Sequence, residues 1–301
     1  MIKRTLYFGN PAYLKTRNEQ MVITKADTGE ETSVPIEDIG VVILDNQQVT
    51  ITQALLAKLL ENNAAVITCD NTHHPTGLLL NLSGNTLQSA KFRAQINASE
   101  PLRKQLWQQT VQCKIENQAG VLERRQVSSK PMYTWAREVK SDDSENHEGR
   151  AAAYYWRNLF GEDSKFRRER FGDPPNNMLN YAYAILRACV ARSLVGSGLL
   201  PTLGIHHRNQ YNAYCLADDI IEPYRPWADL LVCEILEDEN QGPLWRLDTE
   251  TKKRLLTLPQ MDVVFEGKRS PLLVGLQRTT ASLALCFEKK AKRILYPEIP
   301  A

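Results

Sequence analysis

Residues 1 to about 80 alternate between apolar and polar positions in short segments separated by turn residues. This period of two is typical of β-strands with one buried face. The predicted strands are RTLYF, YLKTR, QMVITKA, TSVPI, the apolar run IGVVILD and AAVITCD. A hairpin turn is expected at residues 27–29, where glycine in the sequence Asp-Thr-Gly accepts a positive φ.

One helix interrupts this series of strands. In TITQALLAKLLENN, four leucines recur at helical spacing, and a preceding threonine can cap the helix. The sequence therefore predicts a small β-sandwich-like domain with a single helix over residues 1–78.

The rest of the chain has mainly helical periodicity. Turn-forming residues dominate 71–88, and no charged side chain lies between Asp70 and Lys91. We therefore expect a linker at 79–90. Helices are predicted at LRKQLWQQTVQCKIENQAGVLERR, EGRAAAYYWRNLF, NMLNYAYAILRACVARSLVG, PWADLLVCEILEDE, ETKKRLLTL and TASLALCFEKKAKRIL. The predicted architecture is α+β, with a larger all-α C-terminal domain over 91–301.

Composition narrows the class of protein. A chain of 301 residues suits two domains, and 43% hydrophobic with 24% charged residues argues against a disordered or collagen-like chain. The six cysteines form no CxxC pair and are interpreted as buried thiols in a reducing compartment. Since no apolar run approaches the roughly 18 residues of a membrane span, the sequence predicts a cytoplasmic protein with no membrane partner.

The basic residues are unevenly distributed. Residues 1–80 hold six basic and nine acidic side chains, so the surplus lies in the second part of the chain. Residues 91–140 carry ten basic and four acidic side chains. Two further basic clusters are Lys165, Arg167, Arg168 and Arg170, and Lys289, Lys290, Lys292 and Arg293. A single cluster is more often solvated surface, but three together favour a nucleic-acid partner.

Glu148 is the first candidate for chemistry, because it opens a helix and is followed by Gly149. Glycine in a first helical turn costs about 1 kcal/mol relative to alanine, which is tolerable where another group must approach the backbone. The alternative, favoured on this segment alone, is that Glu148 stabilises the positive end of the helix dipole.

The second candidate is the segment GIHHRNQYNAYCLADDIIEPYRP. Asp219 and Glu222 are three residues apart and share a helix face, and His206 or His207 from the preceding loop could reach it. An imidazole with two or three carboxylates suits Mg²⁺ or Mn²⁺. An equally weighted alternative is a solvated acidic helix face.

For the aromatic residues Tyr154, Tyr155, Trp156, Tyr211 and Tyr214, core packing is favoured over base stacking.

Other chemistries find little support, since the sequence has no Walker loop, Rossmann glycine signature, HExxH or GxSxG motif. No cysteine has a persuasive nucleophile context.

Three sequence blocks carry a resemblance to a known family. They are the EG dipeptide that opens an alanine-rich and then aromatic helix at 148–156, the Gly-x-x-His loop at 204–207, and LADDIIEPYRP at 216–226. The order and spacing of these blocks resemble those of the CRISPR-associated integrase of spacer acquisition, and specifically of its type II branch. The segment PIEDIGVVILDNQQVTITQALLAKLLENNAAVITCD also resembles the family's strand-helix-strand unit.

The resemblance implies a catalytic helical domain that binds one Mg²⁺ or Mn²⁺. The family's ligands fall on Glu148, His207 and Glu222. Asp219 matches a further acidic position of the family, which supports the metal ligands from the edge of the site or from behind them. His206, adjacent to His207, could have a similar supporting role.

The implied reaction is a transesterification that joins the 3'-hydroxyl ends of a prespacer duplex to the first repeat of a CRISPR array. The implied partners are this DNA, a second copy of the chain, a small ferredoxin-like protein of the same operon, and the RNA-guided effector nuclease of type II systems. Two other hypotheses stay open on the residues themselves: a structure-selective phosphodiesterase of DNA repair, and a non-catalytic DNA-binding scaffold.

Overall fold

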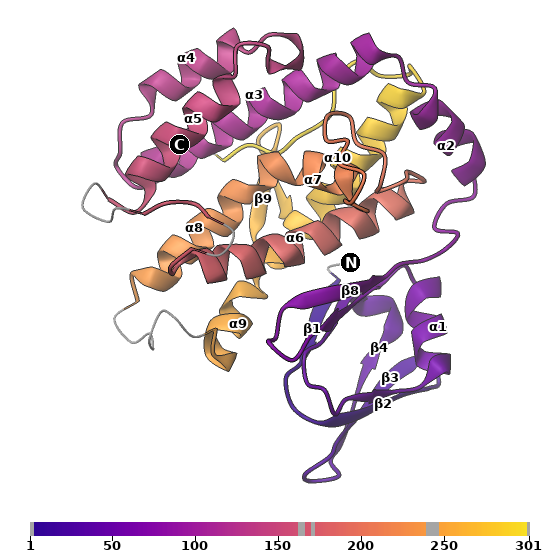
Figure 1. Cartoon of the computed structure of the whole chain (residues 1–301). Coiled ribbons are helices and arrows are strands. Elements are labelled where there is room, and N and C mark those ends of the chain that lie inside the picture. The colour runs from indigo at the N-terminus through magenta and orange to yellow at the C-terminus, as the bar shows by residue number, and fades with distance from the viewer. Residues whose placement is uncertain (1–2, 162–165, 170–171, 239–246, 300–301) are drawn as a thin grey trace.

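The structure is a computed structural model that describes residues 3–161, 166–169, 172–238 and 247–299. A strand-rich N-terminal part lies against a larger helical part (Figure 1). Its elements are β1 Arg4–Phe8, β2 Ala12–Arg17, β3 Gln20–Lys25, β4 Glu31–Pro35, η1 Ile36–Asp38, β5 Ile39–Leu44, β6 Thr50–Ile51, α1 Gln53–Glu61, β7 Ala65–Cys69 and β8 Pro75–Leu79. The predicted helix is confirmed, and Thr52 caps it by accepting a hydrogen bond from the Leu55 N–H.

Two four-stranded sheets form this part, with strand orders β1-β5-β7-β8 and β4-β3-β2-β6. Side chains alternate between the two faces of a strand. Val42 and Val66 accordingly join a core shared with the second sheet and α1, whereas Val41 and Ile67 face the core of the helical part. Strand β8 falls within the turn-rich segment 71–88 and was not predicted.

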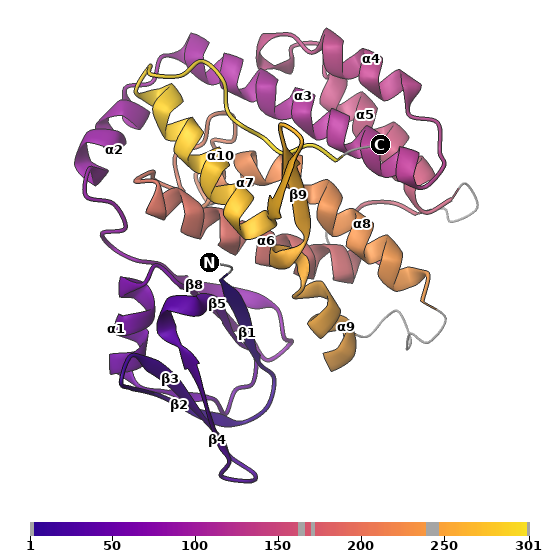
Figure 2. The ribbon, with the colours of Figure 1, turned by 180° about the vertical axis from the view of Figure 1, so that it is seen from behind.

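The second part of the chain is mainly helical (Figures 1 and 2). Its elements are α2 Gln88–Ile96, α3 Glu100–Arg124, α4 Lys130–Glu138, η2 Ser141–Asp143, α5 His147–Leu159, α6 Asn176–Gly196, α7 Cys215–Ile221, η4 Glu222–Tyr224, α8 Arg225–Leu236, α9 Thr249–Leu255, η5 Leu258–Gln260, β9 Asp262–Phe265, β10 Lys268–Pro271 and α10 Leu272–Phe287. Among the described residues no helix combines the length and apolarity of a membrane span.

The prediction of an all-α C-terminal domain is wrong in one respect. Strands β9 and β10 pair antiparallel around a turn at Glu266 and Gly267, both with positive φ. Four-residue strands are too short for periodicity to reveal, and only the Glu-Gly pair indicates the turn. Helix α10 also ends at Phe287, so the predicted basic helix end at 289–293 lies beyond the helix.

Buried polar contacts join the two parts. Lys252 in α9 donates a hydrogen bond of 3.0 Å to Asp45, and both residues are at most 3% exposed. Arg192 in α6 donates to the carbonyl of Asn63. The strand-rich part is therefore packed against the helical part through paired charges as well as apolar side chains.

Candidate functional site

The first turn of α5 presents Glu148. Asp143 receives the backbone N–H groups of His147 and Glu148, each at 2.9 Å. Asn146, in a left-handed conformation, caps the helix by accepting the Gly149 N–H. A Cβ at Gly149 would lie 2.6 Å from the Asn146 Oδ1, so the group that approaches this glycine is the helix cap itself.

Lys114 links Glu148 to Glu222. The Lys114 Nζ on α3 lies 2.6 Å from Glu148 Oε1 and 2.6 Å from Glu222 Oε2. The ammonium donates a hydrogen bond to Glu148 Oε1 and forms a buried ion pair with Glu222 Oε2. Two carboxylates from separate elements thus share one cation.

Further charges and contacts hold Glu222 in place. Arg225 Nη2 lies 3.0 Å from its other oxygen. Burial acts to raise the pKa of Glu222, but Arg225 and Lys114 outweigh it and keep that pKa below its ordinary value. Asn117, one helical turn after Lys114, donates 2.9 Å to the carbonyl of Pro223 and 3.0 Å to that of Pro297. The C-terminal segment therefore braces the backbone beside Glu222.

The loop before α7 carries His207 and is organised by Asp219. The fully buried Asp219 carboxylate accepts the backbone N–H groups of three successive residues, Ile205, His206 and His207, at 2.7, 3.1 and 3.2 Å. It also lies 2.5 Å from His207 Nδ1. This bond raises the pKa of His207 above its ordinary value, although burial opposes it. Because Nδ1 is engaged, Nε2 is the nitrogen left for a ligand.

Gly204 permits this arrangement. A Cβ there would lie 2.4 Å from the carbonyl oxygen of His207 and 2.7 Å from Asp219 Oδ2. The glycine of the Gly-x-x-His block is therefore required by close packing of the loop on the carboxylate.

The two adjacent histidines have different surroundings. The His206 ring stacks on the buried Trp107 indole, with ring centroids 4.2 Å apart and planes at 7°. Its Nδ1 lies 3.5 Å from an Asp142 oxygen. The His207 ring meets the same indole edge-on at 5.8 Å. Trp107 thus serves as a shared wall for both rings.

Asp218 and Asp219 belong to the interior. The Asp218 carboxylate is held by Arg187 through two hydrogen bonds of 2.6 and 2.7 Å. Asp218, Asp219 and Glu222 are all buried. The alternative interpretation of a solvated acidic helix face is wrong, because Arg187, Lys114 and Arg225 provide the positive charge that burial of carboxylates requires.

The donor set fits a hard divalent cation in chemistry and charge. The position between Glu148 and Glu222 already holds one cation, the Lys114 ammonium. Within the described ranges, no group of three or more His, Cys, Asp or Glu side chains is assembled closely enough to hold a metal ion. The two carboxylates therefore share one cation position, whereas His207 is not grouped with them in the part of the chain that the structure describes.

A cavity of about 440 Å³ borders His207. Its walls combine polar and apolar side chains from α2, α3, the loop before α7 and the end of α10, including Ile96, Arg103, Leu203, Arg208, Asn209 and Phe287. Space for a substrate with anionic and apolar parts thus adjoins the imidazole.

The residues of the candidate site lie within a segment of the chain that matches a known protein family. Residues 6–257 match the model of the family described as CRISPR associated protein Cas1. The chain belongs to the Cas1 family. The CRISPR-associated endonuclease Cas1 of Neisseria meningitidis serogroup C (strain 8013) is 40% identical over 303 residues, covering 99% of this chain and 97% of the relative. A second Cas1 endonuclease, from Pyrobaculum aerophilum, is 26% identical and covers 83% of this chain and 88% of its own.

Solved structures share the fold of this Cas1-family chain. A casposase bound to an integration product has a TM-score of 0.79 at 21% identity, covering 98% of this chain and 92% of its own. A Cas1 protein from Thermotoga maritima has a TM-score of 0.73 at 16% identity, covering 95% and 97%. The mixed architecture, strand-rich first and helical afterwards, is thus that of the family.

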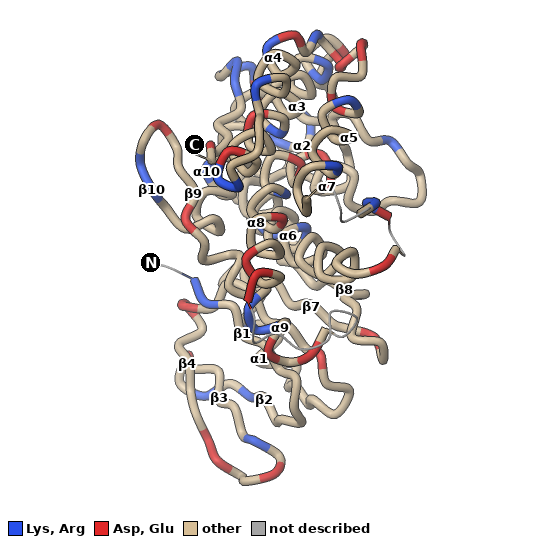
Figure 3. The backbone as a smooth tube through the Cα atoms, turned by 90° about the vertical axis from the view of Figure 1, so that its left-hand side faces the viewer, with Lys and Arg blue, Asp and Glu red and all other residues tan. Residues whose placement is uncertain are grey.

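The basic residues predicted to contact DNA differ in their exposure and in whether other residues of the chain already bind them. Arg168 is tied to Asn176 at 2.9 Å and to Asn180 at 2.7 Å, so it supports its own loop. Arg167 is exposed, and Lys165 and Arg170 lie outside the described residues. Lys289, Lys290, Lys292 and Arg293 are exposed after α10, where Lys290 pairs with Glu288. Figure 3 shows basic residues on the helical part, whereas the loop between β3 and β4 is acidic.

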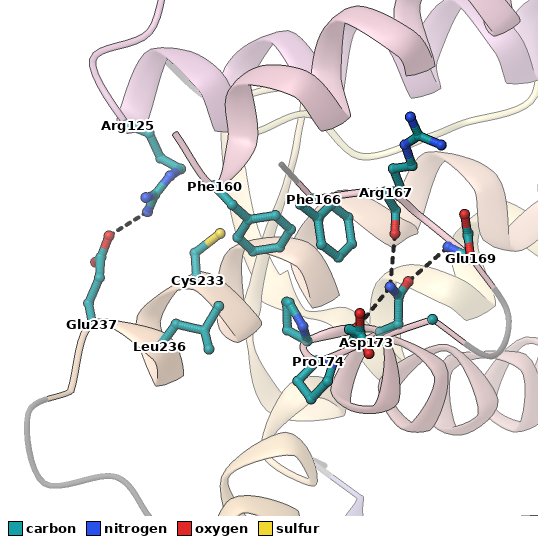
Figure 4. A pocket seen from close by; sticks show the side chains of 13 residues that line it. Arg125, Phe160, Phe166, Arg167, Glu169, Asp173, Pro174, Cys233, Leu236 and Glu237 are labelled. Carbon is teal, nitrogen blue, oxygen red and sulfur yellow. Dashed lines mark hydrogen bonds and ion pairs between the residues drawn. The ribbon is translucent and has the colours of Figure 1, made fainter. Parts of the chain in front are cut away.

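Arg167 also lines a second cavity, of about 650 Å³, which Figure 4 shows from close by. The Phe160 and Phe166 rings lie 4.6 Å apart beside it, and Arg125 pairs with Glu237 at 2.6 Å. Glu148, His207 and Glu222 do not line this cavity. It is therefore separate from the candidate site.

Sequence reasoning missed Lys114 and Trp107. Lys114 is one of the ten basic residues at 91–140 whose charge favours a nucleic-acid partner, yet it is only 8% exposed. Its neighbours at helical spacing are Val111, Asn117 and Gln118, all buried, but two of the three are polar, so hydrophobic periodicity does not indicate this burial. The prediction that Tyr211 packs in the core is wrong, because this residue is 88% exposed.

Proposed function

We propose that this protein joins the 3'-hydroxyl ends of prespacer DNA to the repeat of a CRISPR array by transesterification. The observation that carries the proposal is the shared cation position between Glu148 and Glu222, beside the loop that Asp219 organises around His207. Membership of the Cas1 family supports it.

Glu148, His207 and Glu222 would hold one Mg²⁺ or Mn²⁺ ion. The ion would polarise the scissile phosphate and lower the pKa of the attacking hydroxyl. Asp219 keeps the His207 ring oriented with Nε2 available, and His206 stays stacked on Trp107. The protein's contribution is then to fix these groups and to align attacking and leaving oxygens.

The reaction needs no protein nucleophile. The 3'-hydroxyl oxygen of the prespacer bonds to the phosphorus at the 5' end of the repeat, the bond from that phosphorus to the 3'-oxygen of the preceding nucleotide breaks, and that oxygen takes up a proton. The number of phosphodiester bonds is unchanged. The buried Cys189 and Cys233 suit this account, because burial raises the pKa of each thiol to about 12 and keeps it unreactive.

DNA would be held by basic residues of the helical part. Arg167, Lys289 and Arg293 are exposed and able to reach phosphates, whereas Lys290 would first leave Glu288. Arg168 has the weaker claim because its loop contacts occupy it. Arg103 and Arg208, beside His207, are additional candidates.

The assembly proposed for the chain follows the family. Residues 1–78 would form the β-sandwich-like domain that supports a homodimer and contacts DNA, 79–90 the linker and 91–301 the catalytic domain. Two dimers would flank a dimer of the small ferredoxin-like partner in the cytoplasm, and the type II effector nuclease would help to select prespacers. Among the solved structures with this fold is a Cas6-RT-Cas1–Cas2 complex, with a TM-score of 0.74 at 20% identity.

The test is a strand-joining assay with the partner protein, a 3'-hydroxyl duplex and a plasmid that carries leader and repeat. Wild type and Glu148→Gln are compared in Mn²⁺, Mg²⁺ and EDTA. The matched control is Glu145→Gln, which removes an exposed carboxylate three residues earlier. We expect metal-dependent joining by wild type and Glu145→Gln, and none by Glu148→Gln.

Two results would contradict the proposal. Cleavage of branched DNA without joining, even with the partner, would favour a structure-selective phosphodiesterase with the same site. DNA binding with no product in any metal would favour a non-catalytic scaffold.

A further inference from the structure

Lys114 is a buried lysine with an unusual setting. It lies near the middle of α3, is only 8% exposed, and has buried residues one turn away in both directions. Lysine is almost never fully buried unless its charge is paired. Its ammonium lies 2.6 Å from Glu148 and 2.6 Å from Glu222, the two carboxylates proposed as metal ligands.

The ammonium has a physical effect on these carboxylates. Glu148 is on α5 and Glu222 on η4, so nothing in the local sequence fixes the distance between them. Two negative charges that face one buried position repel each other unless a cation lies between them. Lys114 supplies that cation from a third element, α3, and thereby holds both carboxylates in place.

The neighbouring Arg225 is less suited to this role. Its guanidinium lies 3.0 Å from Oε1 of Glu222, the oxygen that does not face Lys114, and over the Tyr183 ring at 4.9 Å from the centroid. A planar group stacked on an aromatic face is constrained on several sides. Lysine, by contrast, ends a flexible four-carbon stem and can withdraw its charge by changing rotamers.

We propose that Lys114 is a built-in counter-ion which occupies the metal position in the metal-free protein and competes with the divalent ion for Glu148 and Glu222. The inference rests on the proposed metal site and adds a positioning residue to it. Metal binding then requires the ammonium to leave both carboxylates. This competition lowers the apparent metal affinity, while the same contact keeps the empty site from being pushed apart by its own charges.

The first test measures Mn²⁺ binding by titration calorimetry in wild type and Lys114→Met. We expect the dissociation constant of Lys114→Met to be at least tenfold lower, because no ammonium must be displaced. Lys252→Met is the matched control, since Lys252 is equally buried and pairs with Asp45 away from the site. Its Mn²⁺ affinity should equal that of wild type. Glu148→Gln combined with Lys114→Met should lose the gain.

The second test measures thermal unfolding in EDTA and in Mn²⁺. Lys114→Met should have a lower melting temperature than wild type in EDTA and recover most of the difference in Mn²⁺. Lys252→Met should lose the same amount in both conditions, as expected of a merely structural lysine. If Lys114→Met does not fold in either condition, Lys114→Gln, whose amide can still donate to a carboxylate, replaces it in both tests.

The outcomes separate two kinds of failure. If wild type binds Mn²⁺ and the Lys114 variants bind it equally or more weakly, the counter-ion role is wrong and the metal site stands. If neither wild type nor the Lys114 variants bind Mn²⁺, the metal site and the counter-ion role are both wrong. Mn²⁺ binding by the variants alone would support competition in its strongest form.

Discussion

Asp219 lies beneath the loop that carries His207, and its buried carboxylate binds both the imidazole Nδ1 and the backbone N–H of that residue. The same carboxylate receives the N–H groups of Ile205 and His206. One side chain therefore sets the loop path, the ring orientation and the tautomer. Asp219 acts through His207 and is a positioning residue.

Asp219→Asn should weaken Mn²⁺ binding roughly 10- to 100-fold, the usual effect of removing a partner that orients a metal-binding histidine. It should also lower the free energy of unfolding by about 1–3 kcal/mol, because buried N–H groups lose a charged acceptor. Calorimetry and denaturant unfolding measure the two effects. Asp218→Asn is the control, since its partner is Arg187, and it should keep the Mn²⁺ affinity of wild type. Equal losses in both variants would contradict the role of Asp219.

Gly204→Ala should abolish strand joining more completely than Gly149→Ala. The new methyl at Gly204 would clash with a backbone carbonyl at 2.4 Å and with the buried Asp219. At Gly149 it would meet only the Asn146 side chain, which can rotate at the cost of a helix cap, about 1 kcal/mol. Product yield and melting temperature are measured together. A fully active Gly204→Ala would show that the loop geometry is not required.

Much of the fold could be predicted from the sequence because its elements are periodic. Before residue 70, β2 alternates between buried and exposed positions and β5 and β7 are short apolar runs, while long helices such as α3 and α6 have a sustained period. Strands β9 and β10 were not predicted because each has only four residues, and β8 was not predicted because it lies among turn-forming residues.

The candidate site was only partly predictable. The motif blocks indicated Glu148, His207 and Glu222, but charge alone suggested that Lys114 was on the surface. Its burial depends on a tertiary contact between α3, α5 and η4, which no local pattern encodes. The same holds for Trp107, whose contact with the two histidines joins residues about 100 positions apart.

Asp229 should make stability depend on pH. It is buried on α8 and receives hydrogen bonds from Tyr155, at 3.0 Å, and Tyr183. Burial raises its pKa from 3.8 to about 7, although the two tyrosine hydroxyls oppose the shift. Because the folded-state pKa is the higher one, its stabilising contribution is complete below about pH 4 and is lost as the pH rises to 7.

The measurement is the free energy of unfolding of wild type and Asp229→Asn between pH 4 and 8. Wild type should lose stability relative to the variant as the pH rises, by at most about 1.4 kcal/mol per pH unit. Parallel curves would contradict the assignment.

The buried pair Asp45 and Lys252 should couple the two parts of the chain. Removal of one partner from a buried ion pair costs about 3–5 kcal/mol, because the other charge stays buried and unpaired. Asp45→Asn and Lys252→Met should each be destabilising, and the double variant less so than their sum. Denaturant unfolding of all four proteins measures the coupling. Strictly additive losses would show that the pair does not interact.

The ligand set itself can be tested by anomalous diffraction at the manganese edge from crystals soaked in Mn²⁺. We predict one peak in contact with Glu148, Glu222 and Nε2 of His207, with the Lys114 ammonium withdrawn from both carboxylates. Absence of a peak there, or a peak at His206 and Asp142 instead, would contradict the proposed metal centre.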